Sequence, residues 1–295
     1  MWQQKSFEKE GLEPALYLVP TPIGNLEDMS FRALRILKEA NVIAAEDTRN
    51  TKKLCNYFEI TTPIVSYHEH NKEYSGKQML ERLRSGEVIA LVSDAGLPTI
   101  SDPGYELVKD AIAERFKVIP LPGANAALTA LIASGLTPQP FYFYGFLQRG
   151  AKEKKRELEK LKKMESTWII YESPHRLKET LKHMQEVLGD RRIVLCRELT
   201  KKFEEFIRGT ISEALTWAME SEIRGEFCLI IEGGQFPDEE ASEAWWAELD
   251  LVGHVNHYIE AEQYTSKDAI KQVAKDRDIQ KRDVYQAYHI DGEDK

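Results

Sequence analysis

The chain has 295 residues, of which 42% are hydrophobic and 30% are charged, and its formal net charge is −9 at pH 7. This length predicts about two domains, each able to bury a core, and the composition excludes a disordered or fibrous protein. The negative net charge argues against a protein whose whole surface binds nucleic acid.

Two further features of composition bear on location. No apolar run approaches the ~18 residues that a membrane helix needs, and the first stretch, MWQQKSFEKEGLEP, has no apolar signal-peptide core. We therefore expect a cytoplasmic protein with no membrane partner. Cys55, Cys196 and Cys228 have no metal-ligand spacing and lie near apolar stretches, so we expect them to be reduced and buried.

Short apolar runs alternate with amphipathic stretches along most of the chain, a pattern typical of βαβ units around a mostly parallel sheet. In the first part we predict strands at 16–19, 42–45, 63–66, 88–92 and 117–121. Helices are predicted after Ser30, which suits an N-cap, and at about 49–58, 74–85, 103–115 and 123–134. A strand at 141–146 is expected to lead into a second domain.

The second half repeats this alternation and ends in a helical tail. We predict strands at 167–171, 192–196 and 226–234, and helices at 151–163, 174–188 and 212–222. In the tail, Ser266 is predicted to cap a helix with Ile270, Val273 and Ala274 on its inner face; the tail is too short for a core of its own, so we expect it to pack on the body. The predicted domains are residues 1–122, residues 123–236, and the tail, residues 237–295.

Three loops rich in Gly, Pro, Ser and Asp follow predicted strands. They are PTPIGN (20–25), SDAGLPTISDPG (93–104) and PGANA (122–126). Open α/β sheets bind small ligands at the carboxyl ends of their strands, and glycine lets the backbone approach a ligand closely. With Asp94 and Asn125 as fixed polar groups, these loops suit an adenosyl ligand that carries a positive sulfonium.

Several other kinds of site are disfavoured. No G-x-G-x-x-G follows the first strand, and no G-x-x-x-x-G-K-[ST] phosphate loop is present. The seven histidines show no metallohydrolase spacing, so we expect no metal site. The serines of SDAG and SDPG are interpreted as turn caps, because neither lies in a G-x-S-x-G elbow.

Eight segments, in order, resemble the small-subunit ribosomal RNA methyltransferases of the tetrapyrrole-methylase-like family. They are LYLVPTPIGNLEDMS, AEDTRNT, YHEHN, LVSDAGLPTISDPG, PLPGANAALTALIASGL, FYFYGFL, YESPHRL and RELTKKFEE. The resemblance runs from about residue 15 to residue 232, and SKDAIKQVA with KRDVY resembles the helix–turn–helix tail of the family.

This resemblance implies an α/β fold with two αβα domains, mixed and mostly parallel sheets, the active site in the interdomain cleft, and a homodimer. It implies S-adenosylmethionine as the cofactor and no metal. The implied reaction is 2′-O-methylation of a cytidine ribose in the decoding centre of 16S rRNA, in the small ribosomal subunit.

Candidate site residues follow from the loops and the resemblance together. For cofactor binding they are Pro22, Asp94, Ala95, Gly96, Leu97, Ile100, Asn125, Ala126 and Tyr171. A ribose hydroxyl is a weak nucleophile that needs a proton acceptor, and the catalytic candidates are Asp47, Glu46, Arg49 and Glu172, with Asp47 the first choice as base. The alternative is ordinary turn geometry for the loops, a cap for Asp94, and ion pairs across the domain boundary for the charged groups.

RNA contacts are predicted for basic residues in the second half of the chain. From Gln148 to Lys163, eight Lys or Arg accompany three Glu, and such a helix can follow phosphates without reading sequence. The candidates are Lys154, Lys155, Arg156, Arg176, Arg197 and Lys201, with Lys267, Lys271, Lys275, Lys281 and Arg282 in the tail. A solvated helix face is the alternative for the basic helix.

Two rival functions stay open. A tetrapyrrole C-methyltransferase would use the same scaffold, and its acidic substrate would also suit arginines in the cleft. A non-catalytic ribosome-assembly factor would bind RNA and use the loops only as structure.

Overall fold

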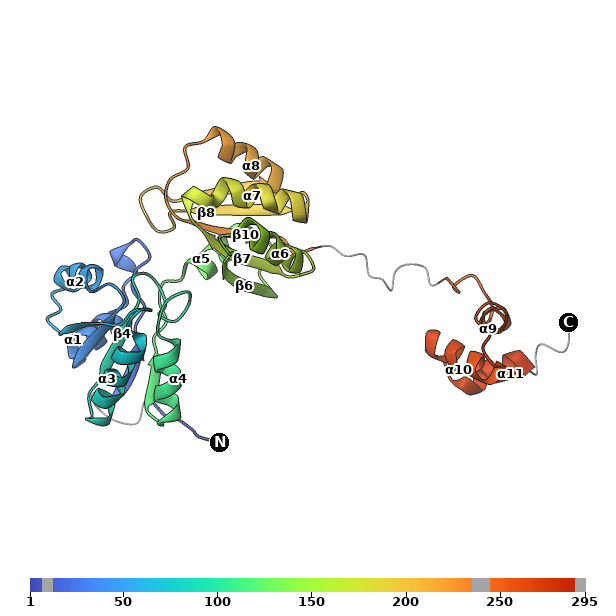
Figure 1. Cartoon of the computed structure of the whole chain (residues 1–295), viewed down its shortest axis with the longest axis horizontal. Coiled ribbons are helices and arrows are strands. Elements are labelled where there is room, and N and C mark those ends of the chain that lie inside the picture. Colours follow the sequence, from blue (N-terminus) through green and yellow to red (C-terminus); the bar gives the residue numbers. More distant parts are fainter. Residues whose placement is uncertain (7–12, 235–244, 290–295) are drawn as a thin grey trace. The chain divides into compact units, whose positions relative to one another are not determined.

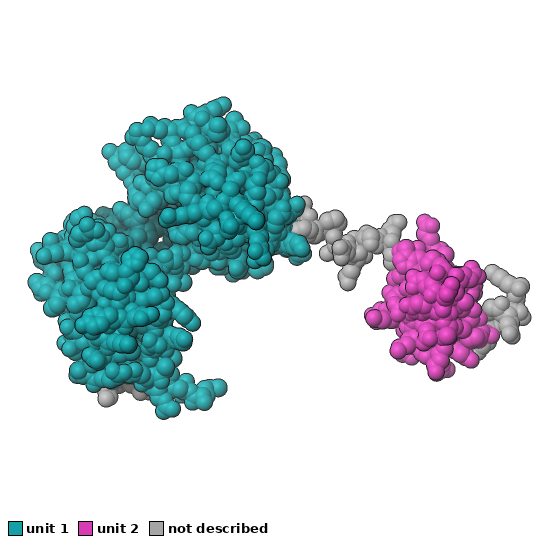
Figure 2. All heavy atoms as spheres, in the orientation of Figure 1, with its two compact units in different colours: residues 1–234 teal, residues 235–295 magenta. Residues whose placement is uncertain are grey.

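The computed structural model describes residues 1–6, 13–234 and 245–289. The chain divides into two units, residues 1–234 and residues 235–295 (Figure 2). Across the described ranges, no helix combines the length and apolar character needed to cross a membrane.

The first sheet of residues 1–234 is entirely parallel, with strand order β3-β2-β4-β1-β5 (Figure 1). Its strands are β1 (Ala15–Leu18), β2 (Val42–Ala45), β3 (Ile64–Ser66), β4 (Ile89–Val92) and β5 (Lys117–Pro120). They are connected by η1 (Leu26–Asp28), α1 (Phe31–Glu39), α2 (Thr48–Tyr57), α3 (Lys72–Arg84) and α4 (Tyr105–Ala113). All five predicted strands are confirmed, and Ser30 caps α1 as predicted, its hydroxyl accepting the Ala33 N–H at 3.1 Å.

Alternate residues of these strands build two separate cores, because successive side chains of a strand point to opposite faces. Tyr17 and Ile43 belong to the core that α1 and α2 cover. Leu16 and Leu91 belong to the core that α3 and α4 cover. The result is the predicted αβα arrangement.

The second sheet is mixed, with strand order β6-β7-β10-β8-β9. Its strands are β6 (Phe141–Phe146), β7 (Thr167–Glu172), β8 (Arg192–Arg197), β9 (Glu205–Thr210) and β10 (Phe227–Ile231). Only β6 and β7 pair in parallel, and the other pairings are antiparallel. "Mostly parallel" therefore describes the two sheets together and not this one. Strand β9 was not predicted, because it is polar and, at the edge, pairs only with β8.

Helices cover both faces of the second sheet as well (Figure 1). Ile169 and Val194 share a core with α5 (Ala126–Ser134). Trp168 and Leu195 share the opposite core with α6 (Ala151–Leu161), α7 (Pro174–Leu188) and α8 (Ile211–Glu220). The three cysteines are free and buried, as predicted.

The tail contains α9 (Leu251–Glu260), α10 (Ser266–Asp276) and α11 (Lys281–His289). Ile270, Val273 and Ala274 are buried, as predicted, and pack with residues of α9 and α11 in a core of their own. The expectation that the tail is too short for its own core is therefore wrong. The N-cap of α10 is Thr265 and not Ser266, since the Thr265 hydroxyl accepts the Asp268 N–H at 3.3 Å.

Candidate functional site

The loops that follow β1, β4 and β5 meet at one edge of the first sheet. Thr21 and Gly96 exchange two backbone hydrogen bonds of 2.9 Å, which tie the first two loops together. Gly96 has φ +82°, and a Cβ there would lie 3.4 Å from both the Ala124 carbonyl oxygen and the Ile23 side chain. The three predicted ligand loops are thus in close contact.

A cavity of about 460 Å³ opens beside these loops and is walled on its other side by residues of β7, β8 and β10. Seven of the nine predicted cofactor residues line it: Ala95, Gly96, Leu97, Ile100, Asn125, Ala126 and Tyr171. Its size and its largely apolar wall with a few polar groups are those of a small-molecule site. The Tyr171 hydroxyl also accepts the Ala127 N–H at 3.2 Å, which joins β7 to the first turn of α5.

The two remaining cofactor candidates, Pro22 and Asp94, line a second cavity of about 320 Å³. The carboxylate of Asp94 accepts the Asp47 N–H at 3.1 Å and the Asn50 side-chain amide at 3.2 Å. Asp94 therefore holds the loop after β2 against the loop after β4.

Adjacent carboxylates at the end of β2 differ in their environment. Asp47 is partly exposed and accepts hydrogen bonds from Arg49 Nε at 3.0 Å and Arg49 Nη2 at 2.6 Å, which lower its pKa to about 2. Burial raises the pKa of Glu46, and the nearby charge of Asp94 adds to the rise. A carboxylate held so firmly in its ionised form is a weak proton acceptor, which disfavours Asp47, the first predicted choice as base.

Asp102 is a site residue that the sequence interpretation missed, because SDPG was taken only as a turn. It lines the first cavity. Burial, followed by the charges of Glu46 and Asp94, raises its pKa to about 7. The acidic groups Glu46, Asp94 and Asp102 thus lie close together at the ends of β2 and β4.

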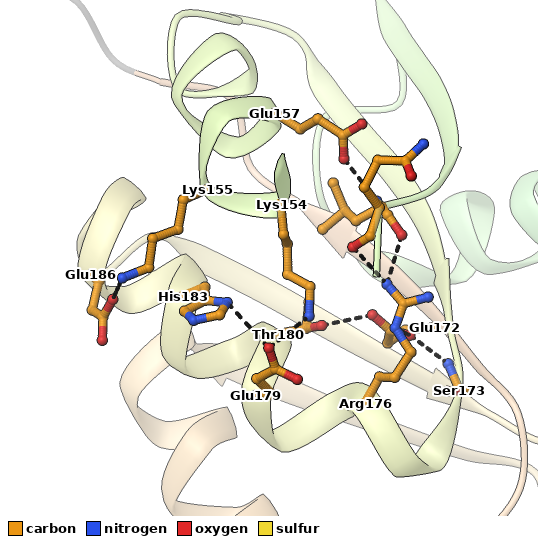
Figure 3. Close-up of polar contacts among 12 residues, drawn as sticks. Lys154, Lys155, Glu157, Glu172, Ser173, Arg176, Glu179, Thr180, His183 and Glu186 are labelled. Carbon is orange, nitrogen blue, oxygen red and sulfur yellow. Dashed lines mark hydrogen bonds and ion pairs between the residues drawn. The ribbon is translucent and has the colours of Figure 1, made fainter. Parts of the chain in front are cut away.

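Glu172, the fourth catalytic candidate, is only 2% exposed and belongs to a network at the start of α7 (Figure 3). Its carboxylate accepts the Ser173 N–H at 2.8 Å and the Thr180 hydroxyl at 2.7 Å, and lies 3.4 Å from Arg176 Nε. Although Glu172 contributes to the cavity wall, these contacts give its carboxylate a structural role.

The three basic candidates near the cavity are all paired locally. Arg176 donates to the Leu147 and Gln148 carbonyl oxygens at 2.6 and 3.2 Å. The other pairs are Arg197 with Glu205 at 3.2 Å, Lys201 with Glu198 at 3.0 Å, and Lys201 with Glu226 at 2.9 Å. These pairs lie within the part of the chain that builds the second sheet, and only Lys201 lines the cavity.

Lys154, predicted to contact RNA, is completely buried. It lies on the inner face of α6 with Leu158 and Leu161, and its Nζ points toward α7, 3.4 Å from the Glu179 carboxylate (Figure 3). The prediction for Lys154 is wrong, since a side chain inside the protein cannot reach a phosphate.

Other basic residues of α6 remain on its surface. Lys155 is half-exposed and paired with Glu186 at 2.6 Å. Arg156, Lys152 and Lys160 are exposed. In the tail, Lys267, Lys271 and Lys275 recur every four residues and are all exposed, so they share one face of α10.

In the part of the chain that the structure describes, no three His, Cys, Asp or Glu side chains are grouped so as to hold a metal ion.

Comparison with known proteins shows the family and the fold of the chain. The family model for Tetrapyrrole (Corrin/Porphyrin) Methylases matches residues 15–215. Ribosomal RNA small subunit methyltransferase I of Bacillus subtilis (strain 168) is 64% identical over 288 residues, 98% of each chain. The protein of that name from Halalkalibacterium halodurans is 58% identical, over 98% of this chain and 99% of its own. Uroporphyrin-III C-methyl transferase from Thermus thermophilus, solved with S-adenyl homocysteine, shares the fold with TM-score 0.54 at 18% identity, over 74% of this chain and 97% of its own.

The burial of Lys154 makes a stability prediction. Lys154→Glu places a second carboxylate beside Glu179 in a buried position, so we expect it to lower the free energy of unfolding by about 3 kcal/mol or more. Lys152→Glu makes the same charge change on the exposed face of α6 and is expected to cost less than about 0.5 kcal/mol. Urea unfolding of both variants measures this, and equal losses would show that Lys154 is not held inside the protein.

Proposed function

Because the chain belongs to the tetrapyrrole methylase family, together with ribosomal RNA small subunit methyltransferase I, we propose that it transfers a methyl group from S-adenosylmethionine to the 2′-hydroxyl of a cytidine in the decoding centre of 16S rRNA. The observation that carries the proposal is the first cavity, into which the fold brings seven of the nine predicted cofactor residues. The predicted homodimer and cytoplasmic location are part of the same proposal.

The lining of the first cavity fits an adenosyl ligand. Leu97, Ile100 and Ala126 offer apolar surface, and Gly96 leaves the loop backbone without a side chain at its closest approach to its neighbours. When bound there, S-adenosylmethionine supplies a methyl group on a positively charged sulfur. The acidic groups near the cavity favour such a charge.

The thiols in the cavity wall do not compete with RNA for the methyl group. Burial raises the pKa of Cys196 to about 12 and that of Cys228 well above its ordinary value. The thiolate is the nucleophilic form of cysteine, so both side chains remain neutral and poorly reactive near neutral pH.

Methylation of a ribose hydroxyl is chiefly a problem of positioning. The methyl carbon has to lie in line between the sulfur and the attacking oxygen, and holding two reactants in that geometry supplies much of the rate. The loops that line the cavity are fixed by the Thr21–Gly96 backbone pair and by Tyr171, which makes this edge of the sheet suitable for the task.

Methyl transfer to small subunits that lack the modification tests the proposed function. With labelled S-adenosylmethionine, we expect label on one decoding-centre cytidine, with resistance to alkaline cleavage at its ribose. Label on no RNA, from a protein that binds the cofactor, would contradict the proposal and favour a small-molecule acceptor such as a tetrapyrrole. Failure to bind the cofactor would favour a non-catalytic RNA-binding factor.

The exposed face of α6 gives a second prediction. Reversing Lys152 and Arg156 together to Glu should weaken binding to 16S rRNA more at low salt than at high salt, because phosphate contacts release counterions. We expect the slope of log Kd against log salt to fall by about two. The double reversal Lys77→Glu and Lys109→Glu, on exposed positions of α3 and α4, is the matched control; an equal loss in both variants would show that α6 makes no particular contact.

A further inference from the structure

Two carboxyl groups lie near the first cavity and influence each other's protonation. Glu46 comes directly after β2, Asp102 lies in the loop after β4, and each is among the groups that shift the pKa of the other. Glu46 Oε2 is buried and has no hydrogen-bond donor from an N–H or hydroxyl group among the described residues. A carboxylate only accepts hydrogen bonds, so a proton on the neighbouring Asp102 carboxyl would supply the donor that this buried oxygen lacks.

The surroundings keep that proton on the pair up to neutral pH. Burial is the main cause that raises the pKa of Asp102 to about 7, and the charges of Glu46 and Asp94 add to it. His68 faces Glu46 and opposes part of the rise in the pKa of Glu46. The proton belongs to the pair, because strongly interacting groups titrate together.

The two members of the pair have different access to the cavity. Asp102 is in the cavity wall, on the same loop as Gly96 and Ile100, whereas Glu46 does not line the cavity. The titratable groups on the opposite wall are Tyr171, Glu172, Cys196, Lys201, Glu226 and Cys228. Lys201 is neutralised by Glu198 and Glu226, so no free cation from that wall balances Asp102.

We propose that Asp102 accepts the proton of the hydroxyl group that becomes methylated, and that Glu46 is the positioning residue that shares this proton. This role rests on the proposed function. In the step, the hydroxyl oxygen forms a bond to the methyl carbon while the carbon–sulfur bond breaks and its electron pair returns to sulfur. The hydroxyl proton moves to the Asp102 carboxylate, which later releases it to water.

The rival carboxylates are less suited to this step. Asp47 is held ionised by Arg49 with a pKa of about 2, and both oxygens of Glu172 accept hydrogen bonds within the protein. A general base works best when its pKa lies near the operating pH. Asp102 meets that condition and also faces the cavity.

The experiment measures single-turnover methyl transfer by the full chain between about pH 5.5 and 8.5, a range that spans about one and a half units on each side of neutrality. In the wild-type protein the rate should rise with pH as the pair loses its proton, with a midpoint near the pKa of about 7. Asp102→Asn should lower the plateau by about 100-fold or more. Glu46→Gln removes a neighbouring negative charge and supplies an amide donor, so the midpoint should move to lower pH by about one unit.

A readout without methyl transfer accompanies the kinetics. Carbon-13 NMR of the side-chain carboxyl groups should show one titration near neutral pH in the wild-type protein, absent in Asp102→Asn and moved to lower pH in Glu46→Gln. Asp110→Asn, an exposed carboxyl on α4, makes the same charge change and should alter neither readout. Calorimetric binding of S-adenosylhomocysteine confirms that each variant is folded.

The outcomes separate this role from the proposed function. If the wild-type protein methylates RNA but Asp102→Asn keeps its rate, or Glu46→Gln lowers the rate without moving the midpoint, the assignment is wrong while the function stands. No titration near neutral pH in the wild-type spectrum would also overturn it. If the wild-type protein transfers no methyl group to RNA, the proposed function fails and this role fails with it.

Discussion

The parallel pairing of the first sheet determines where the ligand loops lie and therefore where the first cavity forms. The strand order β3-β2-β4-β1-β5 places β2, β4 and β1 side by side, so the segments that follow them must meet at one edge. The Thr21–Gly96 backbone pair then fixes two of those segments against each other. Ile23, Gly96 and Asn125, which are distant in sequence, thereby line one space, and residues of the second sheet complete the wall of the cavity. Glycine at position 96 is required where the loops approach most closely.

The same pairing explains why acidic groups are crowded at that edge. The two adjacent carboxylates at the end of β2 have different neighbours. Asp47 binds Arg49, whereas Glu46 lies beside Asp94 and Asp102. Crowded carboxyl groups in a half-buried site cannot all be ionised. Burial and the neighbouring charges raise the pKa of Asp102 to about 7, next to a cavity of cofactor size. Strongly perturbed pKa values in a cleft are typical of functional sites.

The fold and most of the cofactor cavity could be predicted from sequence, because buried parallel strands appear as apolar runs and ligand loops are rich in glycine and proline. The failures have physical causes. Edge strand β9 was missed because it is polar. Lys154 was predicted to be on the surface because it is charged, although its spacing from Leu158 and Leu161 places it on the inner face of α6. Asp102 was missed because its raised pKa comes first from burial and then from the charges of Glu46 and Asp94, and no local sequence pattern records these surroundings. Pro22 and Asp94 lie in the predicted loops but line the second cavity.

We propose that the first cavity, and not the second, binds the methyl donor. Calorimetric titration of S-adenosylhomocysteine into the full chain tests it with two tryptophan substitutions, Ala95→Trp in the first cavity and Lys53→Trp in the second. Both replaced side chains are exposed, so neither change disturbs a core. Ala95→Trp should weaken binding by about tenfold or more, a change of about 1.4 kcal/mol, and Lys53→Trp should leave it unchanged. The reverse pattern, or equal losses, would contradict the assignment of the cofactor site.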